Sequence, residues 1–145
     1  MPEEKIAGII RELTKVTEAG DLEKTIAFFA EDAVLTDPYS TYKGKDAIKA
    51  HMGGMYNNLK NMKYVETGNR IIVQGSKAFS EYVISGTFQG QKWEILSMAA
   101  YEFSGDKVIS MRESYDRMLI AKQVAPWPAS IMVNMMIKQS EKATK

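Results

Sequence analysis

The spacing of apolar residues changes once along this chain, and the change restricts the fold more than any other feature. Apolar residues recur at helical intervals from Ile6 to Val16, whereas they alternate with polar residues from about Met62 to Tyr115. Turn-forming pairs such as Gly68-Asn69 and Gln89-Gly90 divide the second region. Helices followed by strands predict an α+β fold, and the regular turns predict a meander of long antiparallel strands.

The segment between these two regions predicts two more helices and one short strand. Asp21 and Asp46 are placed as N-caps, because each carboxylate directly precedes a run with helical spacing. Residues 33–36 predict a strand that ends at Asp37-Pro38, since proline cannot donate to a central ladder. The buried faces expected of the two helices are Leu22, Ile26 and Phe29 for the first, and Ile48, Met52, Met55 and Leu59 for the second.

Length and charge limit the classes of protein that this chain can represent. A chain of 145 residues fits one domain, residues 1–145. A net charge of +1 provides no footprint for nucleic acid, and the apolar runs are too short to span a membrane. The polar start, with no apolar region behind it, predicts no secretory signal and therefore a cytoplasmic protein.

The residue types present also limit the chemistry. The chain has no cysteine, which excludes disulfides, thiolate catalysis and cysteine-based metal sites. With a single histidine and no ligand-type spacing, the sequence predicts no metal site. We therefore expect chemistry without a cofactor.

The last segment, residues 117–145, differs from the rest of the chain. It is apolar and rich in methionine but is broken by Pro126 and Pro128. Methionine suits an adaptable contact surface. We expect a helical tail that covers either a pocket or a partner subunit.

Three segments resemble one known group of proteins. The stretch from Ala19 to Pro38, followed by Gly44-Lys45-Asp46-Ala47-Ile48, resembles the front half of bacterial ketosteroid isomerases and SnoaL-like polyketide cyclases. The stretch from Phe103 to Glu113 resembles their last hairpin. The resemblance covers roughly residues 5–116 and places the chain in the nuclear transport factor 2-like superfamily. It implies a cone-shaped, curved antiparallel sheet wrapped around N-terminal helices, an apolar pocket under a helical lid, and a homodimer formed through the outer face of the sheet.

The resemblance to the isomerases also implies residue roles. Asp37 falls on the general base that moves a proton between carbons of an enone. The tyrosine of the oxyanion hole falls at Leu13 and its carboxylic acid partner at Ala99, so both strong donors are missing. The SnoaL-like cyclases place their acid/base carboxylate on the same strand position as Ala99.

The limonene epoxide hydrolases, in the same superfamily, match in part. Their last aspartate falls at Glu113, whereas their upstream arginine and aspartate fall near Tyr82 and Ile84. Neither of these residues can replace the charged group that the water-activating mechanism needs. The resemblance to this group therefore implies a carboxylate without its partners.

Three ionisable residues are candidates for catalysis, each with a structural alternative. Glu113 shares a strand face with Met111 and Tyr115, so burial would raise its pKa, unless the strand end is solvated or an arginine pairs with it. Asp37 is a candidate base or an Asx-turn residue. His51, beside methionines, is a candidate acid/base group or a partly buried histidine with satisfied hydrogen bonds.

Aromatic and small side chains predict the wall of a ligand cavity, although packing would also account for each of them. The predicted ligand contacts are Leu13, Tyr39, Tyr56, Tyr82, Trp93, Ala99, Tyr101 and Tyr115. We expect a cofactor-free enzyme that moves a proton on a small hydrophobic or polycyclic substrate, as in isomerisation, cyclisation or dehydration. The alternatives are hydration of an epoxide and a non-catalytic module that binds a hydrophobic ligand or assembles proteins.

Overall fold

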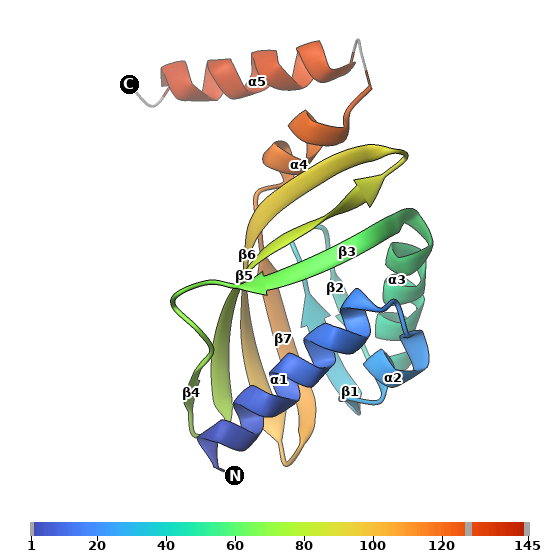
Figure 1. Cartoon of the computed structure of the whole chain (residues 1–145), viewed down its shortest axis with the longest axis vertical. Helices are drawn as coiled ribbons and strands as arrows, with labels where there is room; N and C mark the ends of the chain where they lie inside the picture. The colour runs from blue at the N-terminus through green and yellow to red at the C-terminus, as the bar shows by residue number, and fades with distance from the viewer. Residues whose placement is uncertain (1, 127–128, 144–145) are drawn as a thin grey trace.

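The protein is a mixed α+β fold in which N-terminal helices lie against a curved, unclosed sheet of seven strands (Figure 1). The structure, a computed structural model, describes residues 2–126 and 129–143. The elements in chain order are α1 (Glu3–Glu18), α2 (Leu22–Ile26), β1 (Phe29–Thr36), β2 (Thr41–Lys43), α3 (Lys45–Asn58), β3 (Leu59–Glu66), β4 (Ile72–Gln74), β5 (Lys77–Phe88), β6 (Gln91–Ser104), β7 (Lys107–Ser114), α4 (Arg117–Val124) and α5 (Ala129–Ala143).

The sheet has the strand order β2-β1-β7-β6-β5-β3, and β4 pairs with β5 beside β3. The strands from β3 to β7 pair antiparallel, which confirms the predicted meander, whereas β1 runs parallel to β7. On β5 and β6 every second side chain is buried. One face of these long strands therefore carries the interior, and the other faces outward.

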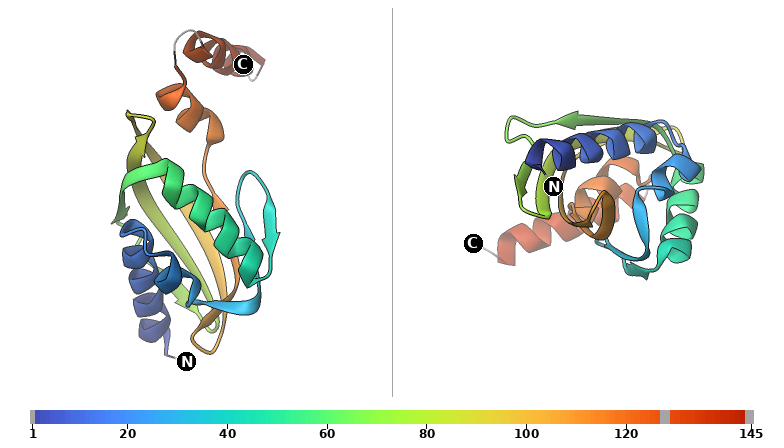
Figure 2. Two further views of the ribbon diagram at one scale, coloured as in Figure 1. Left: turned by 90° about the vertical axis from the view of Figure 1, so that its right-hand side faces the viewer. Right: turned by 90° about the horizontal axis from the view of Figure 1, so that it is seen from below.

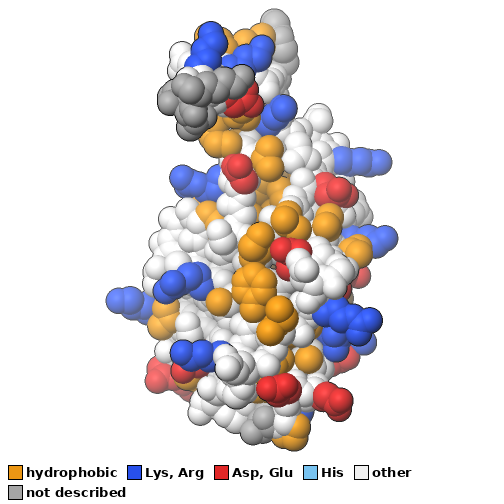
Figure 3. Space-filling view, turned by 90° about the vertical axis from the view of Figure 1, so that its left-hand side faces the viewer, with side chains coloured by type: hydrophobic (Ala, Val, Ile, Leu, Met, Phe, Trp, Pro, Cys, Tyr) orange, Lys and Arg blue, Asp and Glu red, His pale blue; other side chains and the backbone are white. Residues whose placement is uncertain are grey.

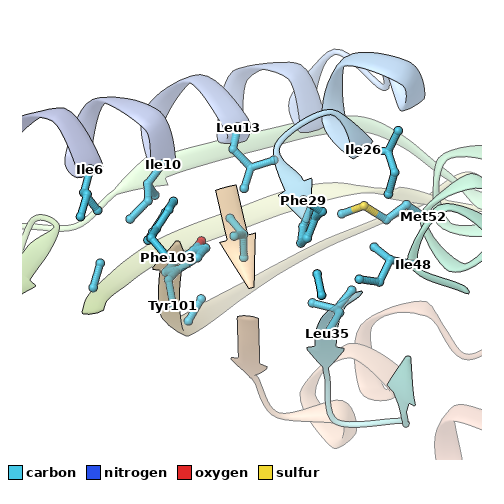
Figure 4. Packing of buried hydrophobic residues seen from close by; sticks show 14 residues of the cluster. Ile6, Ile10, Leu13, Ile26, Phe29, Leu35, Ile48, Met52, Tyr101 and Phe103 are labelled. Atoms are coloured by element: carbon cyan, nitrogen blue, oxygen red, sulfur yellow. The ribbon is translucent and has the colours of Figure 1, made fainter. Parts of the chain in front are cut away.

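Helix α1 covers one end of the concave face (Figure 2). Its buried residues include Ile6, Ile10 and Leu13, and Ile6 and Ile10 point toward Phe103 on β6 (Figure 4). The helix ends before Gly20, whose φ of 70° lies in the left-handed region that glycine adopts readily. The predicted first helix is confirmed.

Three details of the predicted second and third helices are wrong. Asp21 caps α2 as expected, with its carboxylate accepting from the Lys24 N–H, but Phe29 begins β1 and is not on the helix. The residue before α3 is Gly44, with φ 89°, and no side chain of the described residues caps this helix; Asp46 lies in its first turn. Leu59 likewise belongs to β3, because its backbone pairs with Phe88 of β5.

The tail begins as a short helix at the open end of the sheet. Asp116 caps α4, since its Oδ1 accepts hydrogen bonds from the N–H groups of Met118 and Leu119. Helix α4 contacts β6, and α5 contacts α4 beyond the end of the sheet (Figures 1 and 2). The largest exposed apolar side chains of α5 are Ile131, Met132, Met135 and Met136. Within the described residues, no helix has the length and apolar character that crossing a membrane requires.

Candidate functional site

A cavity of about 740 Å³ lies between the concave face of the sheet and the helices that cover it. This volume is within the range of about 300–1,000 Å³ that is usual for small-molecule sites. The predicted contacts that line it are Leu13, Tyr39, Tyr82, Trp93, Ala99, Tyr101 and Tyr115. Tyr56 is not among the lining residues, because its hydroxyl lies 2.8 Å from Thr25 Oγ1 between α2 and α3.

The cavity exists because small residues alternate with large ones on β5 and β6. Ser80, Ser97 and Ala99 are buried and line it, and their short side chains leave room between the neighbouring rings. Gly86 has a related effect on the wall. A Cβ atom there would lie 2.8 Å from Met62 Sδ and 3.0 Å from the Trp93 ring, so glycine permits Trp93 to pack against β5.

Glu113 lies on the inward face of β7, opposite Ala99 of β6, and lines the cavity. Its Oε1 accepts a hydrogen bond of 3.1 Å from the Ser97 hydroxyl, and within the described residues no arginine or lysine pairs with it. Burial raises the pKa of Glu113 to about 7; the Ser97 hydroxyl lowers it and the charge of Asp37 raises it further. A carboxyl group that titrates near neutrality can both accept and donate a proton.

Asp37 lies in the tight turn between β1 and β2, and its side chain is only 6% exposed. Its Oδ1 accepts hydrogen bonds from the backbone N–H groups of Tyr39 (2.8 Å) and Ser40 (2.9 Å). The residue thus forms an Asx-type turn and lines the cavity at the same time. Asp37 is therefore an Asx-turn residue and also remains a candidate base.

His51 is brought to Asp37 by helix α3. Its Nε2 lies 3.0 Å from Asp37 Oδ2, and its ring stacks on Tyr42 with 3.9 Å between ring centroids. Both carboxylate oxygens of Asp37 therefore have partners, one in the turn and one on the imidazole. The three candidate catalytic residues line a single cavity, and the charge of Asp37 acts on Glu113.

The open end of the cavity carries a cation that the sequence pattern did not single out. Arg117, the first residue of α4, lines the cavity and lies over the Tyr39 ring, 5.2 Å from its centroid. Tyr39 is 58% exposed and packs against Tyr115 with 6.3 Å between centroids. These three side chains come from the β1–β2 turn and the start of the tail, so they form the rim.

The tyrosines of the cavity wall differ in their hydroxyl partners. Tyr82 and Tyr101 lie 3.5 Å from the hydroxyls of Thr14 and Ser80. For Tyr64 and Tyr115, no hydrogen bond from the hydroxyl is formed within the described residues. Burial raises the pKa of both, and Glu113 raises it further.

Tyr64 was missed among the predicted contacts, although the sequence contains a signal for it. The strand β3 alternates, with Met62 and Tyr64 on its partly buried side. The same period-two pattern that predicted the strand therefore also predicts an inward tyrosine. Among the described residues, no group of three or more His, Cys, Asp and Glu side chains is arranged to hold a metal ion.

Comparison with known proteins gives a family and a fold. A sequence model of the SnoaL-like domain matches residues 10–111. A Catenulispora acidiphila protein with a ketosteroid isomerase-like fold, solved in complex with trimethylamine, is similar with a TM-score of 0.75 and 17% identity, over 83% of this chain and 94% of that one.

Two further solved structures share the fold. An NTF2-like protein from Burkholderia xenovorans LB400 has a TM-score of 0.72 and 20% identity, over 85% of this chain and 98% of its own. An LEH-like epoxide hydrolase from M. tuberculosis has a TM-score of 0.73 and 12% identity, over 91% of this chain and 98% of its own. At these identities the likeness shows the fold, and the chemistry depends on the residues in the cavity.

Proposed function

Because the chain belongs to the SnoaL-like domain family, we propose that it is a cofactor-free enzyme that moves a proton on a small apolar substrate held in the cavity. The observation that carries the proposal is Glu113, a carboxyl group in an apolar wall whose pKa is raised to about 7. A base is most effective when its pKa lies near the working pH. The volume of the cavity suits a substrate of one to a few fused rings.

Glu113 is the leading base in this proposal, and Asp37 takes second place. The resemblance to the isomerases places Asp37 on their general base, but both of its oxygens have partners in the turn and on His51. Among the described residues the Glu113 carboxyl has one donor, Ser97, and it lines the cavity. Asp37 then orients His51 and keeps Glu113 protonated to a higher pH, which makes Glu113 a stronger base when ionised.

The reaction core is the removal of a proton from carbon and its return to carbon or oxygen. The Glu113 carboxylate accepts the proton, and the electron pair of the C–H bond moves onto the adjacent unsaturated group of the substrate. The protonated Glu113 then returns the proton at the same or a neighbouring atom. Nothing is oxidised, so no redox cofactor is required.

Hydrogen–deuterium exchange on a simple ketone tests the proposal. 2-Tetralone, a bicyclic apolar ketone with acidic C–H bonds, is incubated with the protein in deuterated buffer and followed by NMR. We expect catalysed exchange whose rate rises with pH through about 7, because the carboxylate form of Glu113 is the base. Glu113→Gln should lower this rate by roughly 10²- to 10⁴-fold.

The matched control for this substitution is Glu102→Gln on the neighbouring strand β6. Glu102 follows Tyr101 and so lies on the opposite face of the strand, away from the cavity. Exchange at wild-type rates in Glu113→Gln would remove Glu113 from the mechanism. Tight binding of 2-tetralone with no exchange in the wild-type protein would instead favour a non-catalytic binding module, which the apolar Leu13 and Ala99 also suit.

We further propose that the protein forms a homodimer through the outer face of the sheet. Phe79, Leu96 and Met98 are exposed there, on the sides of β5 and β6 that point away from the cavity. Figure 3 shows apolar side chains gathered in a stripe along this side of the molecule. Exposed apolar patches of this kind commonly mark protein contacts. Light scattering of the purified protein, compared with Leu96→Lys, would show whether the mass is doubled and depends on this face.

A further inference from the structure

Two partly buried tyrosines of the cavity wall have hydroxyls without the partners that Tyr82 and Tyr101 have. Tyr64 on β3 and Tyr115 after β7 both line the cavity and are partly buried, yet neither hydroxyl forms a hydrogen bond within the described residues. Tyr56, Tyr82 and Tyr101 each have a hydroxyl group of another residue within 3.5 Å. Within the cavity wall, the lack of a hydroxyl partner therefore separates Tyr64 and Tyr115 from Tyr82 and Tyr101.

These two hydroxyls remain accessible. Among the described residues, the side-chain nitrogen or oxygen atoms that are both sealed from solvent and unpartnered are limited to Trp93 Nε1. The hydroxyls of Tyr64 and Tyr115 are therefore not fully sealed, and the residues that carry them line the cavity. Because a polar group in an apolar wall loses free energy when it has no partner, a ligand that supplies an acceptor is favoured there.

The same two side chains line the cavity together with Glu113. The ionised form of each is disfavoured first by burial and next by the charge of Glu113, and Tyr64 also responds to Tyr115. Both tyrosines therefore stay neutral and act as hydrogen-bond donors. Leu13 and Ala99, by contrast, add only apolar surface to the wall.

We propose that the hydroxyls of Tyr64 and Tyr115 form the polar end of the cavity and hold a carbonyl oxygen of the ligand beside Glu113. The ligand class is then an apolar ketone, and not a hydrocarbon or a purely apolar ether. The inference rests on the proposed function, because it places the acceptor oxygen next to the carbon that Glu113 deprotonates. Tyr64 and Tyr115 are substrate-binding residues in this scheme, and they stabilise the oxygen when it gains negative charge.

Two probes of nearly the same shape test the proposal by binding alone. 2-Acetylnaphthalene carries a C=O group where 2-isopropenylnaphthalene carries C=CH₂, so they differ chiefly in the acceptor oxygen. Calorimetric titration of the full chain gives the ratio of the hydrocarbon Kd to the ketone Kd. We expect this ratio to fall on the order of tenfold in Tyr64→Phe and in Tyr115→Phe, and further in the double variant.

The matched control is Tyr56→Phe, which removes a tyrosine hydroxyl outside the cavity. Its ratio should stay within about twofold of the wild-type value, since a loss of general stability does not distinguish the two probes. Unchanged ratios in both cavity variants, with thermal unfolding showing that they are folded, would overturn the inference. Such a result would leave the exchange assay for Glu113 untouched.

The infrared carbonyl stretch of bound 2-acetylnaphthalene provides a measurement that needs no variant. Hydrogen bonds to the oxygen lower this frequency relative to the ketone in hexane, so we expect a lowered frequency in the wild-type complex that returns upward in Tyr64→Phe and Tyr115→Phe. A bound frequency equal to that in hexane would contradict the proposal even if both variants failed to fold. Failure of both probes to bind would contradict the proposed function together with this inference.

Discussion

The two ends of the concave face of the sheet are built from the same strands but are filled differently. At one end, α1 lays Ile6 and Ile10 on Phe103, and the interior is closed (Figure 4). At the other end, β5 and β6 place Tyr82, Ile84, Trp93 and Ile95 around open space. Inward and outward side chains alternate along both β5 and β6 at the two ends alike.

The cover over each end accounts for the difference. Helix α1 has 16 residues and buries a full apolar side, whereas α4 has 8 residues, none of which is buried. Ile120 and Val124 of α4 pack against the second cluster but remain partly exposed. The lesson is that stability and binding are separated along one sheet: the end under the buried side of α1 is a core, and the end under α3 and the short α4 is a site.

The largest expected effect comes from truncating one isoleucine to alanine at each end of the sheet, which tests whether one end is packed and the other hollow. Ile10 is fully buried in the closed end, and Ile84 is 4% exposed in the wall of the cavity. Ile10→Ala should lower the free energy of unfolding by about 4 kcal/mol, because it creates a new void among close-packed neighbours. Ile84→Ala should cost about 2 kcal/mol, since the isoleucine already lacks contacts on its cavity side.

Urea unfolding with a shared m-value measures both changes. Equal costs at the two positions would contradict the view that one end is packed and the other hollow. A larger loss of unfolding free energy in Ile84→Ala than in Ile10→Ala would mean that the cavity end is the more tightly packed one.

The pH dependence of stability sharpens the comparison, because only the hollow end holds the raised pKa of Glu113. The pKa is 4.5 in the unfolded chain and about 7 in the folded one, so between these values the folded state binds more protons. Stability from this group is therefore full below pH 4.5 and is lost as pH rises through 7. Glu113→Gln removes this loss and should stabilise the protein at pH 8 by roughly 3 kcal/mol relative to wild type.

The measurement is the difference in the free energy of unfolding between variant and wild type at a series of pH values, which cancels the other groups. Glu102→Gln, on the outward face of β6, provides a flat reference. A flat curve for Glu113→Gln would mean that the Glu113 carboxyl is solvated in the folded state.

Much of the fold could be predicted because its signals are local. The helical spacing that begins at Ile6 and the alternation that begins at Met62 each reflect which side of one element is buried. Phe29 was misassigned for a non-local reason: it fits the spacing of Ile26, but it pairs with Val108 at the start of a parallel contact with β7. Asp46 was misassigned as a cap because the entry into α3 needs a positive φ, which Gly44 supplies.

The site could be predicted residue by residue but not as an arrangement. Period two and the turn motif singled out Glu113 and Asp37, and the structure places both in one cavity. Their partners could not be read from the chain, because His51 reaches Asp37 from α3 and Ser97 reaches Glu113 from β6. The free hydroxyl of Tyr64 is not visible in sequence either, since a tyrosine is free or bonded only by reference to other elements.

The hydroxyl of Ser97 gives the smallest and most local test of the hollow end. It donates to Glu113 Oε1 at 3.1 Å and lowers the pKa of Glu113, since it stabilises the carboxylate. Ser97→Ala should raise that pKa by on the order of one unit, because hydrogen bonds to charged groups are the stronger ones and one unit corresponds to about 1.4 kcal/mol. Carbon NMR of the labelled Glu113 carboxyl during a pH titration measures the midpoint.

Ser80→Ala is the control, because Ser80 is also buried in the cavity wall but its hydroxyl lies near that of Tyr101. Its midpoint for Glu113 should match that of the wild-type protein. An upward shift in Ser97→Ala alone would mean that one hydroxyl keeps the base from becoming fully protonated at neutral pH. A midpoint unchanged in Ser97→Ala would show that water, and not Ser97, solvates the Glu113 carboxyl. The cavity wall around Glu113 would then be hydrated instead of apolar.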